Sequence, residues 1–274
     1  MTSDELTVTA GAATDVGQRR TVNEDSFVAQ APVFLVADGM GGHDAGDLAS
    51  AAVIAEFARH VGRSALESDE VRDTLEHAQA RVTEIAGGGN AGTTLTGAVM
   101  ATVGGDPYWL VVNIGDSRTY RFAGGALEQI SVDHSVVQEL VDAGALDADA
   151  AARDSRRNVI TRAIGGGDGG DARADYWLLP VEQGDRLLAC SDGLTGELDD
   201  DEIAAVLTAV ADPAEAAAEL VRRAVEHAGR DNVTAIVVDV ARTGAEDDID
   251  DTVPTGRLDG DTRPRASRLI EGAR

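Results

Sequence analysis

Four short, mainly apolar runs in this chain each carry an aspartate at or near one end. The runs cover residues 33–37, 110–115, 187–191 and 233–238, and the aspartates are Asp38, Asp116, Asp192 and Asp231. A short apolar run bounded by Gly or Asp indicates a buried strand. A carboxylate at the end of such a strand lies at the rim of a core, where an unpaired charge is unfavourable. Because few cationic side chains accompany these aspartates, the pattern indicates that metal ions supply the missing positive charge.

The donor types indicate which metals would fit. Oxygen ligands select hard cations such as Mg²⁺ or Mn²⁺, and the chain lacks the Cys and His spacing of a zinc site. Two such ions about 3.5–4 Å apart can activate a shared water and hold the oxygens of a phosphoryl group. Gly39 follows Asp38 directly, and glycine lets the backbone approach a metal closely enough for its carbonyl to bind. An arginine fork suits a phosphate dianion better than any other side chain.

Composition limits the partners and the compartment. The chain has 274 residues, a formal net charge of −26 and one cysteine, Cys190. Nucleic acids and anionic membranes are bound through basic patches, so we expect neither as a partner. A single cysteine forms no intramolecular disulfide, which fits a reducing compartment. We recognise no signal sequence and no apolar stretch of membrane-spanning length, and therefore expect a cytoplasmic protein that is a monomer by default.

The periodicity of apolar residues predicts blocks of strands and pairs of helices. We expect strands at 6–13, 27–38 with a turn at Pro32, 93–103, 109–114, 118–122, 127–130, 175–179, 185–191 and 233–240, and helices at 45–61, 65–85, 135–143, 199–210 and 213–228. A doubly wound parallel sheet would alternate single strands with single helices, and this chain does not. The sequence therefore predicts an α+β fold in which helix pairs cover antiparallel sheets.

Two segments differ from the rest. Residues 134–171 combine a helix, an arginine-rich patch and a glycine cluster, a mixture typical of a mobile excursion above a rigid scaffold. The acidic and apolar-poor residues 242–274 predict a disordered tail, in which Thr252 and Thr255 are candidate phosphorylation sites. The folded domain is thus expected to cover residues 1–241.

Six motifs occur in order along residues 6–240. They are Arg20-Thr21-Val22-Asn23-Glu24-Asp25, Asp38-Gly39-Met40-Gly41-Gly42-His43, Gly115-Asp116-Ser117-Arg118, Asp133-His134-Ser135, Ser191-Asp192-Gly193-Leu194 and Asp231-Asn232-Val233-Thr234. This ordered set resembles the bacterial branch of the PPM family, the metal-dependent serine/threonine protein phosphatases of type 2C. The resemblance implies a four-layer α/β/β/α sandwich, two packed antiparallel sheets flanked by helix pairs. It also identifies residues 134–171 as the family's flap, which influences substrate access.

The resemblance implies a set of metal ligands. They are Glu24, Asp38, the carbonyl of Gly39, Asp116, Asp192 and Asp231. Asp38 would bridge two core Mn²⁺ or Mg²⁺ ions. Asp192 and Asp231 would complete the first site, while Glu24 and Gly39 would hold the second. Asp116, again with Asp192, would bind a third and weaker ion.

The resemblance also implies the reaction. Arg20 would bind the substrate phosphate, and Asp25 would orient metal-bound water. A metal-bridging hydroxide would attack phosphoserine or phosphothreonine of phosphoproteins directly, opposing a bacterial Ser/Thr kinase. Met40 stands where eukaryotic members have a histidine proposed to protonate the leaving alkoxide, so the leaving-group acid is unassigned.

Several positions allow a simpler interpretation. Any one of the aspartates taken alone could be a turn or cap residue, and this alternative is strongest for Asp116. Arg19 adjoins Arg20, although the spacing to Glu24 favours Arg20. We expect His43 to be structural and His134 to cap the first helix of the flap.

Two other functions are compatible with the motifs. One is a partner-switching phosphatase of stress signalling, which acts on a phosphorylated anti-sigma antagonist; the chain carries no attached sensor domain of the kind expected there. The other is a pseudophosphatase, a binding module without catalysis. The expected ligand positions are all filled, which argues against the second alternative.

Overall fold

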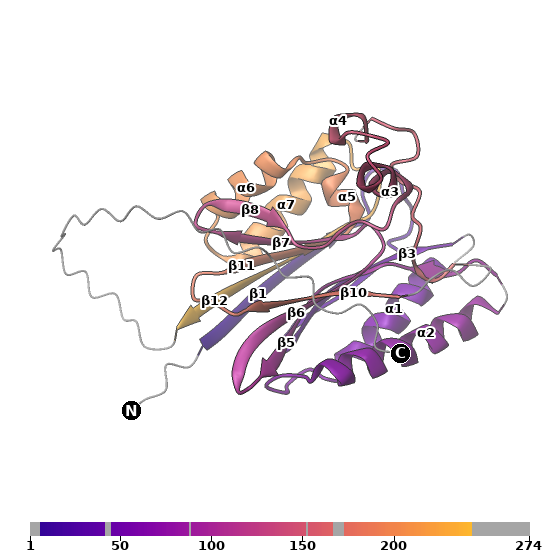
Figure 1. Ribbon diagram of the computed structural model, residues 1–274. Coiled ribbons are helices and arrows are strands. Elements are labelled where there is room, and N and C mark those ends of the chain that lie inside the picture. The colour runs from indigo at the N-terminus through magenta and orange to yellow at the C-terminus, as the bar shows by residue number, and fades with distance from the viewer. Residues whose placement is uncertain (1–5, 42–44, 88, 152, 167–172, 243–274) are drawn as a thin grey trace, which may run out of the picture.

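The computed structural model describes residues 6–41, 45–87, 89–151, 153–166 and 173–242 (Figure 1). His43 and the predicted tail from residue 243 onward, with Thr252 and Thr255, lie outside these residues.

Runs rich in Val, Ile, Leu and Ala form the strands, since such side chains pack well on a pleated, buried surface. The strands are β1 (Leu6–Asp15), β2 (Asp25–Gln30), β3 (Val33–Met40), β4 (Gly92–Thr93), β5 (Leu95–Val103), β6 (Asp106–Ile114), β7 (Arg118–Ala123), β8 (Ala126–Gln129), β9 (Ile164–Gly165), β10 (Asp175–Pro180), β11 (Arg186–Cys190) and β12 (Val233–Arg242).

In the described residues the strands form two sheets. One has the order β1-β12-β11-β7-β8, and the other has the order β10-β6-β5-β3-β4-β9, with β2 paired to β3. The pairs between these strands are antiparallel. The β2–β3 register places Asp25 opposite Asp38, so two acidic side chains share one end of that hairpin.

Two pairs of helices, α1 (Gly46–Ala58) with α2 (Ser68–Ala86) and α6 (Asp200–Ala209) with α7 (Pro213–His227), cover the outer faces of the sheets. The shorter helices α3 (Val136–Asp142), α4 (Ala148–Ala151) and α5 (Asp192–Thr195) lie outside these pairs. Figure 1 shows α1 and α2 on one outer side of the molecule and α6 and α7 on the other. Separate apolar cores lie under each helix pair and between the sheets. This arrangement confirms the predicted α+β sandwich of two antiparallel sheets flanked by helix pairs.

Several predicted boundaries were wrong. The helix expected from residue 65 begins at Ser68, because Glu67 and Glu70 form a capping box there. The helix expected to reach residue 61 ends at Ala58. The strand expected at 93–103 is split, since Gly92–Thr93 pairs with β3 and β9 while β5 begins at Leu95.

No helix in the described parts of the chain has both the length and the apolar character that crossing a bilayer requires.

Candidate metal centre

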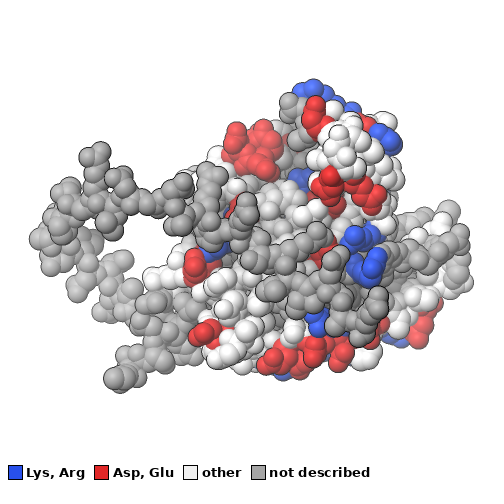
Figure 2. Space-filling view, viewed as in Figure 1, with Lys and Arg blue, Asp and Glu red and all other residues white. Residues whose placement is uncertain are grey.

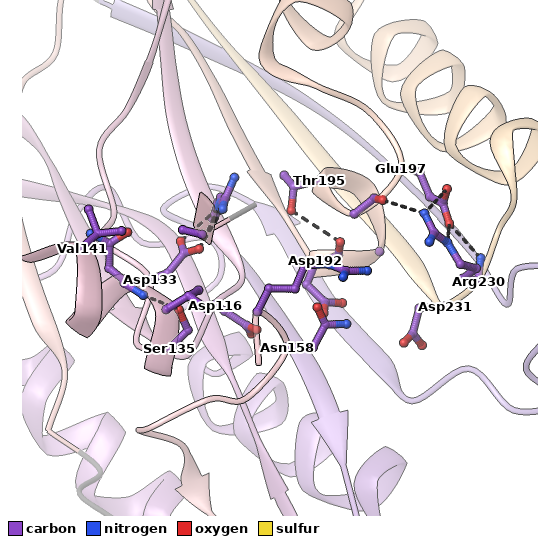
Figure 3. A pocket seen from close by; sticks show the side chains of 17 residues that line it. Asp116, Asp133, Ser135, Val141, Asn158, Asp192, Thr195, Glu197, Arg230 and Asp231 are labelled. Carbon is purple, nitrogen blue, oxygen red and sulfur yellow. Dashed lines mark hydrogen bonds and ion pairs between the residues drawn. The ribbon is translucent and has the colours of Figure 1, made fainter. Parts of the chain in front are cut away.

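The ends of several strands bring the predicted carboxylates to one edge of the sandwich. Asp38 lies within the last residues of β3, and Asp116 lies between β6 and β7. Asp192 follows β11 and is the first residue of the short helix α5, which the sequence did not predict. Asp231 lies between α7 and β12. Figure 3 shows Asp116, Asp192 and Asp231 along one cavity.

These carboxylates interact strongly with one another. Burial raises the pKa of Asp38 well above its usual range, and the charges of Asp25 and Asp192 raise it further. Burial, again with a contribution from Asp192, raises the pKa of Asp116 to about 8. The pKa of Asp192 is raised by burial and by Asp231, although a hydrogen bond with Asp38 opposes this shift. The cluster is therefore a concentration of negative charge that few nearby cations compensate.

The donor set fits hard divalent cations. The converging side chains offer oxygen atoms only, as Mg²⁺ and Mn²⁺ prefer. One of these atoms, Oδ1 of Asp25, is buried and has no hydrogen-bond partner. As they are placed, no group of three or more Asp, Glu, His or Cys side chains in the described chain could hold a metal ion. Metal binding would therefore require the carboxylates to adjust, exchanging their shared hydrogen bond for ligation.

Glu24 and Gly39 lie against each other at the start of α1. The amide of Gly39 donates to the Glu24 carbonyl at 3.1 Å. A Cβ atom at Gly39 would collide with the backbone of Gly46, and one at Gly46 would collide with the Glu24 carboxylate. Gly39 therefore requires glycine, a side chain at Gly46 would displace the Glu24 carboxylate, and this close packing brings the predicted ligands of the second metal together.

Arg20 points into the cluster from the loop after β1. Its Nη2 donates to Oδ2 of Asp231 at 2.7 Å, and about half of its side chain is exposed. This hydrogen bond raises the pKa of Arg20, so the guanidinium is permanently charged. The candidate phosphate-binding residue and a candidate metal ligand are thus direct neighbours.

Two hydroxyl groups from the other sheet hold the Asp25 side chain in place. Its Oδ2 accepts from Ser191 Oγ at 2.8 Å and from Thr234 Oγ1 at 2.6 Å. Burial raises the pKa of Asp25 to about 7, although these hydrogen bonds oppose the shift. The side chain therefore joins the two sheets directly beside Asp38.

Asn232, for which the sequence indicated no role, has a buried amide side chain that organises the loop carrying Arg20 and Glu24. Its Nδ2 donates to the carbonyls of Val16 at 3.0 Å and Val22 at 2.9 Å. Its Oδ1 accepts from the amide of Glu24 at 2.9 Å. The sequence did hold one signal for this role: an asparagine directly follows Asp231, and its side chain can both donate to backbone carbonyls and accept from a backbone amide.

A cavity of about 470 Å³ extends from the carboxylates toward the predicted flap. Asp116, Asp192 and Asp231 line one part of it, and α3 with the segment around Asn158 lines another. Arg230 closes a wall through its ion pair with Glu197 at 2.8 Å. The cavity therefore connects the acidic cluster with the segment predicted to be the flap.

Comparison with known proteins identifies the family. The sequence profile of the family named protein phosphatase 2C matches residues 16–228. The serine/threonine phosphatase Stp of Listeria monocytogenes is 32% identical over 241 residues, which are 82% of this chain and 93% of Stp. The serine/threonine protein phosphatase PstP of Mycobacterium tuberculosis is 36% identical over 250 residues, which are 86% of this chain but 45% of PstP.

The structural comparison agrees. The crystal structure of the catalytic domain of PstP in complex with two manganese ions matches with a TM-score of 0.77 and 33% identity. The match covers 86% of this chain and 100% of that domain. This chain therefore belongs to the protein phosphatase 2C family, and the predicted resemblance is confirmed.

Proposed function

We propose that this protein hydrolyses phosphoserine and phosphothreonine on proteins and so opposes a serine/threonine kinase. The observation that carries the proposal is the convergence of Asp38, Asp116, Asp192 and Asp231 in one cluster, where burial and neighbouring carboxylates raise the pKa values of the first three. Mutual repulsion of this strength calls for cations, and the family of the chain consists of phosphatases. The alternatives of a partner-switching enzyme or a silent binding module draw no support from the site.

The proposed metal ligands are those that the motifs indicate. They are Glu24, Asp38, the carbonyl of Gly39, Asp116, Asp192 and Asp231. Two divalent ions, when bound, supply an activated water and neutralise the phosphoryl oxygens. The two manganese ions of the PstP catalytic domain support a two-ion centre here. A third ion at Asp116, and the use of Mg²⁺ in place of Mn²⁺, are part of the proposal.

The chain's own contribution begins with capture of the phosphate. A net charge of −26 repels an anionic substrate at long range, so attraction must come from nearby cations. Arg20 lies next to the carboxylates and has exposed surface, so its fork can bind phosphate oxygens while Nη2 holds Asp231. Asp25, held by its two hydroxyl partners, is positioned to accept a hydrogen bond from water in the cluster. Met40 cannot donate a proton, so a group other than this side chain must protonate the leaving alkoxide.

The organisation of the chain follows from the same proposal. Residues 1–241 would be the catalytic domain, and residues 134–171 would be its flap beside the substrate cavity. The partners would be phosphoproteins and a kinase that modifies them. A monomeric state and a cytoplasmic location complete the proposal.

The test compares metal-loaded and chelated protein on an aryl phosphate and on a phosphothreonine peptide. With Mn²⁺ we expect both to be hydrolysed, and excess chelator should abolish both activities. Asp192→Asn should do the same, whereas the control Asp73→Asn, on the exposed face of α2, should retain full activity. Undiminished hydrolysis in excess chelator would refute the metal-dependent reaction.

A further inference from the structure

His134 lies buried at the start of the predicted flap, and it contacts the turn that carries Asp116. Its ring Nδ1 accepts a hydrogen bond from the amide of Gly115 at 3.1 Å, and its own amide donates to the Gly115 carbonyl at 2.8 Å. The expectation that His134 caps the first flap helix was wrong. Ser135 is the cap of α3, because its Oγ accepts from the amide of Gln138. The imidazole is thus free to bind a segment distant in sequence.

The same residue also binds the returning end of the flap. The carbonyl of His134 accepts from the amide of Thr161 at 2.8 Å, and the neighbouring Ser135 forms a bridge with Ile160. On the other side of the ring, Nε2 lies 3.4 Å from Oδ2 of Asp175. One residue therefore joins three parts of the chain: its ring binds the Gly115 turn and lies beside Asp175, and its backbone carbonyl binds the returning end of the flap.

Each ring nitrogen faces a donor. The Gly115 amide donates to Nδ1, while Nε2 lies 3.2 Å from Nη1 of Arg162 and 3.4 Å from Oδ2 of Asp175. Burial lowers the pKa of His134, and the positive charge of Arg162 acts in the same direction. Both effects favour the neutral imidazole, the form in which Nδ1 can accept from the Gly115 amide.

Other contacts restrict the Gly115 backbone together with His134. Gly115 has φ +105°, in the left-handed region that favours glycine, and a Cβ atom there would clash with Thr94. Its carbonyl also accepts from Asn113 Nδ2 at 3.2 Å. The next residue is Asp116, which lines the cavity. The Gly115 peptide held by these contacts thus directly precedes the cavity-lining Asp116.

We propose that His134 is a positioning residue that fixes Asp116 in the acidic cluster and couples it to the base of the flap through the bond between Nδ1 and the Gly115 amide. Asp116 and the two ends of the flap then shift together, because the ring and the backbone of a single residue hold all three. The inference rests on the proposed function of Asp116 as a weak metal ligand, which it extends to a link between that ligand and the flap.

The first experiment uses two amide substitutions of different reach. In His134→Asn the amide oxygen can take the place of Nδ1, whereas in His134→Gln the longer side chain places its amide near Nε2. Hydrogen exchange of the Gly115 amide is measured in the metal-free protein. We expect exchange about tenfold faster in His134→Gln and within about threefold of the parent protein in His134→Asn. Equal exchange in the two variants would overturn the inference, as would an unchanged rate in both.

The second experiment asks whether His134 acts through Asp116. Removing one such hydrogen bond should lower kcat/KM for a phosphothreonine peptide about three- to tenfold in His134→Gln, with recovery in His134→Asn. In an Asp116→Asn background the same substitution should change kcat/KM less than about twofold, because its target is already lost. Fully multiplicative effects would show that His134 acts elsewhere, and would refute the proposal.

A matched control and the choice of readouts separate the two proposals. His77→Asn, on the exposed face of α2, should change neither measurement. If the parent protein hydrolyses no phosphate ester, the proposed function fails, while the exchange measurement on metal-free protein still tests the contact. If the parent is active and the exchange rates do not separate, only the inference about His134 fails.

Discussion

Acidic side chains occupy two kinds of region in this protein, and their electrostatics are opposite. On the outer helices several of them pair with arginine: hydrogen bonds from Arg63 hold the pKa of Glu70 at about 2, and those from Arg222 do the same for Glu219. Figure 2 shows such basic and acidic groups interspersed on one face. At the edge of the sheets, burial and neighbouring carboxylates instead raise the pKa of Asp116 to about 8.

The net charge of the protein therefore does not locate the site. The positions of the arginines do, because they show which carboxylates are paired. Among the described residues, the ion pair that reaches the cluster is that of Arg20 with Asp231. Arg118 is close to Asp116, but Asp133 already neutralises it through an ion pair of 2.8 Å. The carboxylates at the edge thus keep an excess of negative charge, which bound cations can neutralise.

The largest effect should come from removing the central carboxylate. Asp38→Asn should lower kcat/KM at least about a thousandfold, because it removes the proposed bridge between two metals. The same change should raise the thermal midpoint of the metal-free protein, since it removes a buried charge that its neighbours repel. Calorimetry without metal checks the second outcome. Glu219→Gln is the contrast, because it should lower stability slightly and leave activity intact. A metal-free Asp38→Asn protein that is less stable than the parent would contradict the proposed difference between the two regions.

The pH dependence of stability should also differ between the two regions. In the metal-free fold the pKa values of Asp25 and Asp116 are about 7 and about 8, above their unfolded values. The folded state then binds more protons than the unfolded state, so stability falls as pH rises toward 8. The surface carboxylates have lowered values, so their contribution is present above about pH 4.5 and is lost in acid.

Thermal unfolding between pH 5 and 9 tests this, with and without Mn²⁺. The midpoint of the metal-free protein should decrease from pH 5 to about pH 8 and then level off, and metal should flatten or reverse the trend. A midpoint that increases with pH in the absence of metal would show that the edge carboxylates are compensated after all.

The sequence predicted the strands, the helix pairs and the carboxylates at strand ends, because those features are local. Apolar runs ending in Asp can be recognised without knowing which strands are neighbours. The long-range hydrogen bonds could not be predicted. Asp25 binds Ser191 and Thr234, and His134 binds Gly115 across a hairpin, so their partners follow from the sheet order. For His134 the local pattern was misleading, since its neighbour Ser135 was the helix cap.

A smaller effect is expected at the cation of the cluster. Arg20→Ala should raise KM for a phosphothreonine peptide about tenfold, and Arg20→Lys should recover part of this loss without the two-pronged fork. Steady-state kinetics on the peptide is the measurement. Arg19→Ala is the matched control, and it decides between the two neighbouring arginines. If Arg19→Ala has the larger effect, the predicted phosphate-binding residue is wrong.

The smallest effect is expected for the outer ion pair. Arg63 donates to both oxygens of Glu70, at 2.7 and 3.0 Å, and both side chains are well exposed. Arg63→Ala should lower the thermal midpoint by no more than about 2 °C and should not change kcat/KM, because exposed pairs contribute little and salt screens them. Glu70 also accepts from the Glu67 amide at 2.9 Å, so the capping box of α2 survives the substitution. The difference from the parent protein should vanish in about 1 M salt, where the screening length is about 3 Å. A change in activity would mean that the paired surface charges communicate with the edge cluster, and the division between the two regions would fail.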